Sequence, residues 1–387
     1  MAERSYFDWN ATAPLRPEAR TALAEALRLP GNPSSVHAEG RAARHAVERA
    51  REQVATLVGA QPGDVVFTSS GTEANMLALT PAIEVDGGNG PRTRLLISAI
   101  EHASVRAGGR FPHEGIEELP VGPDGRLELA ALETAVARCP RALVSVMLAN
   151  NETGVIQPVA EAATIVHAAD GLLHVDAVQA AGRIACDIAA LGADLMTLSA
   201  HKIGGPKGVG ALIRRGEDIR LAEPLIRGGG QERGVRAGTE NVAGIAAFGA
   251  AAAAARDLRE IETRRMLELR SRLEAGLREV LPSAVIFGAE APRLPNTTLF
   301  ASPGMRAETA VIAFDLEGIA VSSGAACSSG KVQPSHVLAA MGVPPELRGA
   351  VRLSLGWSTT EADIERFQNA WRKLATTLSR GLRGIAA

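Results

Sequence analysis

The stretch DLMTLSAHKIGGPKGVGALIRR, residues 194–215, contains two apolar runs separated by a glycine-rich turn. The runs, 194–199 and 210–215, have the length and composition of buried strands. His201 and Lys202 come directly after the first run, and in open α/β sheets ligands bind beyond the carboxyl ends of the strands. The stretch therefore predicts strands of a central sheet and one side of a binding site at its edge.

Other apolar runs of strand length precede this stretch and alternate with amphipathic segments such as 160–170. They are residues 65–68, 94–100, 142–149 and 172–177. Such alternation is typical of an α/β domain with a mostly parallel sheet flanked by helices. Residues 241–281 are rich in helix formers and predict a long helix or a helix pair. After Pro282 short strand-like and helical segments alternate, which predicts a smaller α+β domain.

The chain of 387 residues is long enough for two domains, because single hydrophobic cores stop growing at roughly 250 to 300 residues. We expect an N-terminal arm over 1–14 that packs with the small domain. A large cofactor-binding domain would follow over 15–255, and a small C-terminal domain carrying Cys327 would cover 256–387.

Composition limits the kinds of partner. Hydrophobic residues make up 46% of the chain and the formal net charge is -2, so no global field attracts nucleic acid or an anionic membrane. The charged N-terminus lacks the apolar stretch of a secretory signal, and no other run approaches a membrane span. We expect a cytoplasmic protein whose partner is a small molecule or another protein.

The cysteines Cys139, Cys186 and Cys327 have no paired spacing, which argues against a disulfide framework and against a CxxC-type metal site. Cys327 lies in SSGAACSSGK, residues 322–331, among small and hydroxyl-bearing neighbours. A cysteine retained for packing usually lies in an apolar run. Cys327 is therefore the candidate reactive thiol, and we interpret the other two as structural.

Lysine is scarce in this chain. Lys202, Lys207, Lys331 and Lys373 are the only lysines among 41 basic residues. Arginine replaces the charge of lysine but not its amine in imine chemistry. Lys202 is the leading candidate for such chemistry because it follows a strand end. Lys207, beyond the Gly-Gly-Pro turn, is the weaker one, and compositional bias alone accounts for Lys373.

Polar side chains also follow the earlier strand-like runs. They are Ser70 and Thr72, Glu101 and His102, Asn150 and Asn151, and Asp176 and Gln179. Each has an ordinary alternative role as a helix cap, a turn residue or a hydrogen-bonded histidine. Together, an acid, a lysine, an aromatic nitrogen base and an open helix N-terminus are what pyridoxal phosphate (PLP) requires. The lysine would form the imine, and the acid would keep the pyridine nitrogen protonated.

Longer motifs run through nearly the whole chain. They include YFDWNATAPLRPEA, GNPSSVHAEGR, TSSGTEANMLAL, EHASV, NNETGVIQP, HVDAVQAAG, SAHKIGGPKGVGAL, RGGGQERGVRAGTEN, SSGAACSSG, QPSHVLAAMG and VRLSLGWSTTE. In these motifs the chain resembles the cysteine desulfurases of the NifS/IscS branch, within the fold-type I, class V aminotransferase group. The cysteine loop followed by QPSHVL is the specific part of the resemblance. It implies a fold-type I PLP-dependent transferase.

The resemblance also implies roles for individual residues. For the cofactor these are Lys202 as the Schiff-base lysine, Asp176 at the pyridine nitrogen, Gln179 at the phenolic oxygen, His102 on the ring face, and Thr72, Ser199 and His201 at the phosphate, joined by Thr239 from the other subunit of a homodimer. For the substrate they are Arg352 and Asn151 at the carboxylate and Cys327 as the thiol that takes the sulfur.

The implied reaction converts L-cysteine to L-alanine and leaves a persulfide on Cys327. The sulfur would pass to an acceptor such as an iron-sulfur scaffold protein, or serve thio-cofactor or tRNA biosynthesis. A selenocysteine lyase, or another class V lyase or aminotransferase, remains the alternative enzyme. A non-catalytic sulfur-delivery protein is the alternative outside enzymes, and the intact set of Lys202, Asp176, His102, Arg352 and Cys327 argues against it.

Overall fold

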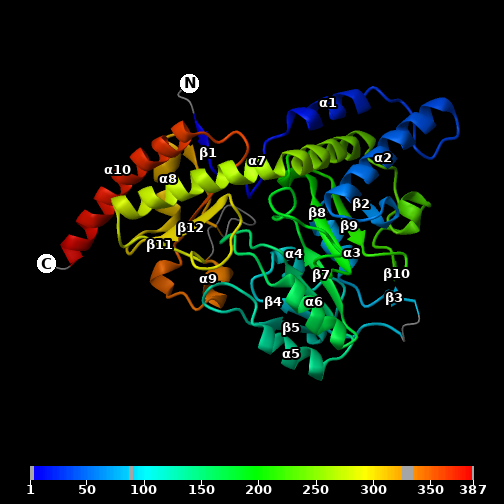
Figure 1. Cartoon of the computed structure of the whole chain (residues 1–387), viewed down its shortest axis with the longest axis horizontal. Helices are drawn as coiled ribbons and strands as arrows, with labels where there is room; N and C mark the ends of the chain where they lie inside the picture. The colour runs from blue at the N-terminus through cyan, green and yellow to red at the C-terminus, as the bar shows by residue number, and fades with distance from the viewer. Residues whose placement is uncertain (1–3, 87–89, 325–333, 386–387) are drawn as a thin grey trace.

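The structure is a computed structural model that describes residues 4–86, 90–324 and 334–385. Within these residues the largest sheet has seven strands in the order β2-β9-β8-β7-β6-β4-β5 (Figure 1). Their bounds are β2 Val65–Thr68, β4 Leu95–Ser98, β5 Ile116–Leu119, β6 Leu143–Met147, β7 Leu172–Asp176, β8 Leu195–Ser199 and β9 Gly210–Arg214. Every neighbouring pair except those of β9 is parallel. The predicted α/β fold with a mostly parallel sheet is confirmed.

The antiparallel direction of β9 follows from the length of its connection. Parallel neighbours need a crossover of about a dozen residues or more, whereas antiparallel neighbours can be joined by a short turn. Only residues 200–209 lie between β8 and β9, so β9 returns beside β8. This turn carries His201 and Lys202, and it places them at the carboxyl edge of β8.

Helices cover both faces of the large sheet. They are α1 Pro17–Ala26, α2 Ala38–Leu57, α3 Gly71–Ala78, α4 Ala103–Arg106, α5 Leu129–Arg138, α6 Val159–Ala168 and α7 Val242–Val280. Successive strand residues point to opposite faces, as the strand period requires. Leu173 and Val175 of β7 therefore pack in the cluster that contains residues of α2, α5, α6 and α7, whereas Leu172 packs in the cluster that contains residues of α3. Burial on both faces explains the continuous apolar runs.

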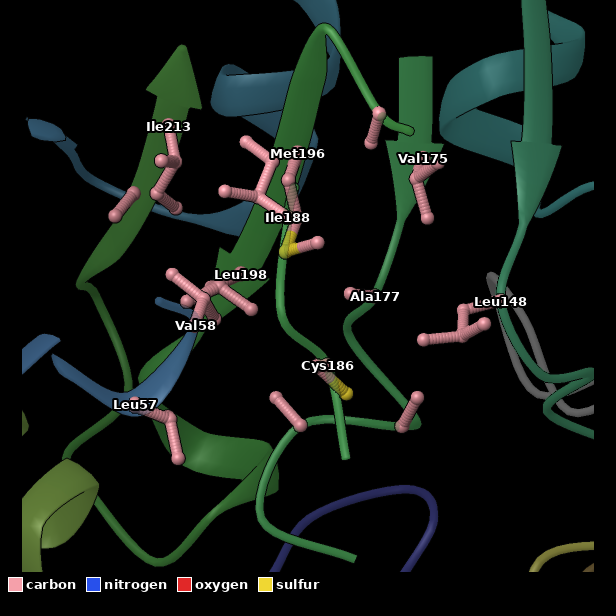
Figure 2. Packing of buried hydrophobic residues seen from close by; sticks show 14 of the residues in the cluster. Leu57, Val58, Leu148, Val175, Ala177, Cys186, Ile188, Met196, Leu198 and Ile213 are labelled. Carbon is pink, nitrogen blue, oxygen red and sulfur yellow. The ribbon is translucent and has the colours of Figure 1, made fainter. Parts of the chain in front are cut away.

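The first of these clusters contains Cys186. Figure 2 shows its side chain among buried apolar residues that include Leu57, Val58, Ile188 and Leu198. Cys186 is 1% exposed, and burial raises the pKa of its thiol to about 12. The thiol is neutral at physiological pH and acts as a small apolar side chain.

Residues after 282 form a second, antiparallel sheet with its own helices. The elements are β11 Val285–Ile286, β12 Thr297–Ala301, β13 Ile319–Ala320 and β14 Val351–Ser354, with α8 Ala307–Leu316, α9 His336–Ala340 and α10 Glu361–Ile385. The order β11-β12-β14 is antiparallel throughout, and β13 pairs with β1 Ser5–Tyr6 of the N-terminal segment. A further antiparallel pair, β3 Ile83–Val85 with β10 Ile219–Leu221, lies beside the large sheet.

The segment predicted as a long helix or helix pair is a single helix, α7. It runs past both sheets (Figure 1) and packs against α1, α2 and α10. Near the C-terminal end of α7, the Leu277 carbonyl accepts a hydrogen bond from the indole N–H of Trp371 in α10 at 3.2 Å. The domain boundary expected at residue 255 falls inside α7, and the division into domains stays a prediction.

Arg16 ties the start of the chain to α7 and to the turn after β8. Its Nη1 and Nη2 donate to the two carboxylate oxygens of Glu262 at 2.9 and 2.7 Å, and its Nε donates to the Ile203 carbonyl at 3.1 Å. The guanidinium carbon lies 4.0 Å from the ring centroid of Trp357. Gly204, at φ +88°, completes the contact, because a Cβ there would lie 2.5 Å from both Arg16 and Trp357.

Replacing Glu262 with Ala should lower the free energy of unfolding by about 3 to 5 kcal/mol, because the buried Arg16 charge loses its partner. Chemical denaturation of the cofactor-free chain measures this. The matched control is Glu118→Ala, which breaks the partly exposed Arg106–Glu118 pair and should cost far less. Equal losses in the two variants would contradict the assignment of Arg16–Glu262 as a structural tie.

Candidate active site

A cavity of about 290 Å³ lies at the carboxyl ends of β6, β7 and β8. Its walls also include the start of α3, the N-terminal segment and β14. Of the predicted residues, Thr72, His102, Asn151, Asp176, Gln179, Ser199, His201, Lys202 and Arg352 line this cavity. The fold thus brings together side chains that are as many as 280 residues apart, since 352 - 72 = 280.

Lys202 ends the short 3-10 turn Ala200–Lys202 after β8. Its Nζ donates to the carbonyl oxygens of Asn10 and Ala11 at 2.5 and 2.9 Å. The same Asn10 carbonyl accepts from Gln179 Nε2 at 3.0 Å. The amine that would carry the cofactor is therefore held by backbone from the N-terminal segment.

Asp176, the last residue of β7, is buried and receives two N–H groups. Asn75 Nδ2 donates to its Oδ2 at 2.9 Å, and the Val178 amide donates to its Oδ1 at 3.0 Å. Donors on both oxygens fix the direction of the carboxylate. This is the arrangement that a protonated pyridine nitrogen requires of its partner.

His102 caps α4, and its hydrogen bonds assign its tautomer. The Ser104 amide and hydroxyl both approach Nδ1, at 3.2 and 2.8 Å. Because the amide can only donate, Nδ1 accepts and the ring proton lies on Nε2. The Ser104 hydroxyl is in turn bonded by Asn75 Nδ2 at 2.9 Å, which links His102 to the residue that holds Asp176.

The other end of the cavity is formed by the N-terminus of α3. Ser70 caps the helix, and its hydroxyl accepts from the Glu73 amide at 3.1 Å. A Cβ on Gly71 would lie 3.3 Å from the Ser199 Cβ, so glycine allows the close approach of the helix to β8. His201 is neutral at physiological pH, because burial first and then Lys202 and Lys207 lower its pKa to about 4. Helix amides, hydroxyls and a neutral imidazole suit a phosphate.

Arg352 of β14 forms the side of the cavity that belongs to the smaller sheet. Its Nη1 donates to the Asn151 carbonyl at 2.9 Å, and its Nη2 pairs with Asp8 Oδ1 at 2.8 Å. Its Nε is buried without a hydrogen-bond partner among the described residues. A guanidinium in this position can take a substrate carboxylate.

Of the two remaining predicted site residues, one lies outside this cavity and the other is not described by the structure. Thr239 is exposed and lines a separate hollow with Thr68, Ser69 and Arg236. Cys327 lies outside the described residues. The described Gly324, three residues before it, does line the cavity.

The residues of the QPSHVL motif connect to the strand ends. The Ser335 hydroxyl donates to Glu152 Oε2 at 2.6 Å and caps α9 by accepting from the Leu338 amide at 3.0 Å. His336 Nε2 donates to the Glu101 carbonyl at 3.0 Å. The motif therefore attaches the small antiparallel part of the chain to the site.

Several residues of the site were missed from the sequence. They are Asn10, Asn75, Ser104, Glu152 and Arg183. Asn75 had a usable signal, since it lies one helical turn after Thr72 and so shares its face of α3. Asn10 had none, because it acts through its backbone carbonyl.

No helix in the described part of the chain is long and apolar enough to cross a membrane.

Residues 5–367 match the aminotransferase class-V family. A cysteine desulfurase of Cereibacter sphaeroides is 45% identical over 373 residues, which cover 94% of this chain and 94% of that protein. The cysteine desulfurase IscS of Dictyoglomus turgidum is 40% identical over 370 residues, which cover 94% and 92%. The X-ray structure of a NifS-like protein from Rickettsia africae ESF-5 matches with a TM-score of 0.85 at 37% identity, covering 96% of this chain and 99% of that one.

The chain therefore belongs to the aminotransferase class-V family, whose members are PLP-dependent enzymes of fold type I. Within that family its relatives carry the names cysteine desulfurase, IscS and NifS-like protein. The resemblance drawn from the motifs is confirmed.

Behind the site, His174 of β7 is fully buried between two hydroxyls. Its Nδ1 lies 2.8 Å from Ser145 Oγ and its Nε2 lies 3.0 Å from Thr197 Oγ1. Burial lowers the pKa of His174 to about 4, although Asp176 opposes this shift. The side chain is therefore neutral in the folded protein near neutral pH.

We expect His174 to make stability depend on pH. Below about 6.5 the unfolded chain gains a proton on this residue that the folded chain excludes until about pH 4. The contribution of His174 to the free energy of unfolding is fully present above pH 6.5. Roughly 3 kcal/mol of it is lost as the pH drops toward 4. Comparison of His174→Gln with wild type by denaturation at several pH values should show the stability difference between them shrinking as the pH is lowered. The control is His45→Gln, on an exposed side chain of α2, and parallel wild-type and His174→Gln curves would contradict the expectation.

Proposed function

We propose that this protein is a PLP-dependent cysteine desulfurase, which converts L-cysteine to L-alanine and transfers the sulfur to Cys327. The observation that carries the proposal is the single cavity in which Lys202, Asp176 and Arg352 meet. The names of the relatives support the same activity.

The residues present fit PLP. The cavity offers a helix N-terminus at one end and, at the other, a carboxylate that accepts two hydrogen bonds. A lysine amine lies between the N-terminal segment and β8. When bound, PLP supplies an electron sink that stabilises the carbanion formed by loss of the substrate α-proton. Lys202 would hold the cofactor covalently, and Asp176 would keep its pyridine nitrogen protonated. Gln179 would donate to its phenolic oxygen, and Thr72, Ser199 and His201 would hold its phosphate.

His102 is placed to move a proton. Its Nε2 carries the proton in the neutral ring, while Nδ1 is committed to Ser104. In this tautomer the ring can donate from Nε2, whereas it would take up a proton at Nδ1, the nitrogen that Ser104 bonds. Ser104 also fixes the direction of the ring. Histidine is the side chain that most often performs such proton transfers in enzymes.

Arg352 would bind the substrate carboxylate with help from Asn151. The guanidinium is already held on both sides, by Asp8 and by the Asn151 carbonyl. A guanidinium group that is already held in position loses little side-chain entropy when it binds a carboxylate. These contacts direct an amino acid with its α-carbon toward Lys202.

Sulfur transfer would then need a thiol. Attack by the Cys327 sulfur on the substrate sulfur forms one S–S bond and breaks the substrate C–S bond, so that cysteine and thiol become alanine and persulfide. No outside oxidant is needed. The persulfide would pass its sulfur to an acceptor protein, such as an iron-sulfur scaffold, in the cytoplasm.

The site would be completed by a second copy of the chain. Thr239 lies outside its own cavity and is exposed, in the motif RGGGQERGVRAGTEN. The segment is anchored to α2, because buried Glu232 accepts from Arg51 Nη1 and Nη2 at 2.8 Å each. Glu232 and Arg233 adopt φ values of +46° and +56°, which non-glycine residues rarely do. A strained, anchored segment suits a surface that presents Thr239 to a partner's phosphate site.

Replacing Cys327 with Ser should keep PLP binding and abolish turnover, because a hydroxyl is a poor sulfur nucleophile. An anaerobic assay with L-cysteine that quantifies alanine and protein-bound persulfide together measures both products. Both should fall to background in Cys327→Ser and stay near wild type in Cys139→Ser, the matched control.

Pyruvate, ammonia and sulfide released by Cys327→Ser at near the wild-type turnover rate would instead identify an eliminating lyase, because β-elimination of cysteine gives these products and no alanine. Relative rates on cysteine and selenocysteine then separate a desulfurase from a selenocysteine lyase.

Mixing two inactive variants tests the dimer. Lys202→Ala removes the amine, and Thr239→Asp places a negative charge against the partner's phosphate. In a mixed dimer one site carries both changes and the other carries neither, so activity should rise to about a quarter of the wild-type rate per subunit after random exchange. Thr239→Ser is the control that keeps the hydroxyl. No recovery after exchange, or a fully active monomer in sedimentation, would contradict the shared site.

A further inference from the structure

Arg183 is a buried cation directly behind the cavity. Arg183 comes after β7 in the chain, and the residue is only 7% exposed. Burial first, and then the charge of Arg352, lower its pKa to about 10. No carboxylate among the described residues is ion-paired with it. A buried guanidinium without a carboxylate is costly, so its contacts indicate its role.

Those contacts are with carbonyl groups of the site. Arg183 Nη1 donates to the backbone oxygen of Gln179 at 2.6 Å and to its side-chain Oε1 at 2.7 Å. Nη2 reaches the Lys202 carbonyl at 3.5 Å. The Arg183 carbonyl accepts from Thr263 Oγ1 of α7 at 2.8 Å, which anchors the arginine to that helix.

The contact with Oε1 decides which way the Gln179 amide faces. A glutamine amide has one acceptor end and one donor end, whereas a guanidinium only donates. Oε1 must therefore point at Arg183, and the NH2 group must point toward the cavity. There Nε2 donates to the Asn10 carbonyl at 3.0 Å, beside Lys202.

We propose that Arg183 is a positioning residue that keeps the Gln179 NH2 group directed into the cavity, where it donates to the anionic phenolic oxygen of bound PLP. The inference rests on the proposed function and adds a residue to it. Without Arg183, only the Asn10 carbonyl would oppose a turn of the amide that presents its oxygen to that anion. The guanidinium also strengthens the amide as a donor, because hydrogen bonds in a chain polarise one another.

A double-mutant cycle on PLP affinity tests the proposal. The cofactor-free chain is titrated with PLP in wild type, Gln179→Leu, Arg183→Met and the double variant. Each single change should weaken binding by about tenfold, the value of one hydrogen bond to a charged group. The double variant should bind no more weakly than Gln179→Leu, because Arg183 acts through Gln179.

The matched control is Arg92→Met. Arg92 is another buried arginine, which donates to the carbonyls of Arg141 and Asp170 at 2.9 and 3.1 Å and does not line the cavity. This variant should keep wild-type PLP affinity. The proposal would be overturned if the double variant lost PLP affinity by the product of the two single losses. Wild-type affinity in Arg183→Met would also overturn it. A wild-type chain that does not bind PLP would overturn the proposed function as well.

A second measurement needs no cofactor. In Gln179→Glu a carboxylate oxygen replaces Oε1 and can pair with Arg183, which offsets part of the cost of losing the hydrogen bond to the Asn10 carbonyl. The thermal midpoint of the cofactor-free chain should therefore fall only modestly. Combining Gln179→Glu with Arg183→Met should lower the midpoint by more than the sum of the two single changes, because a buried carboxylate is left unpaired. Additive losses would show that Arg183 does not face the Gln179 oxygen, and would overturn the proposal even where Arg183→Met folds poorly.

Discussion

The parallel register of β6, β7 and β8 is the constraint on which the site depends. Met147 lies opposite Asp176, and Asp176 lies opposite Thr197, so the three strands end at one edge of the sheet. A shift of one residue would turn Asp176 to the other face of the sheet and move Val175 out of the cluster in which it packs. Because both faces of these strands are buried, packing of Leu173, Val175 and Met196 specifies the register strongly. The hydrophobic core therefore fixes where the chemistry takes place.

The N-terminal segment couples the two sheets at this edge. The Asn10 amide N–H donates to Ser354 Oγ at 2.9 Å and its Nδ2 donates to Thr297 Oγ1 at 2.9 Å, both in the smaller sheet. Its carbonyl meanwhile accepts from Lys202 and Gln179 of the large sheet. A displacement of either sheet would thus change the position of the lysine. This explains why a residue with no chemistry of its own is completely hydrogen-bonded and buried.

The substrate side of the cavity is connected to the residues that flank 325–333. Ser322 and Arg352 exchange two backbone hydrogen bonds, at 3.2 and 2.7 Å, so the strand that carries the arginine also holds the first residue of the cysteine motif. Glu152 contacts the residues that follow 333, because its carboxylate accepts a hydrogen bond from Ser335. Burial raises the pKa of Glu152, while the Ser335 hydroxyl and Arg352 oppose that shift. Arg352, the proposed carboxylate-binding residue, and the described residues on both sides of 325–333 therefore share one cluster of contacts.

The sequence by itself determined the α/β class, the strand runs, the long helix and most cavity residues, because strand periodicity and polar strand ends are local signals. Lys202, Asp176 and His102 could be named in this way. The antiparallel return of β9, the carbonyl of Asn10 and the guanidinium of Arg183 needed the tertiary structure. Each of these acts through a contact between segments distant in the chain or through backbone atoms, which every residue possesses. Arg183 in particular looks like one arginine among many in the sequence, and only burial against Gln179 distinguishes it.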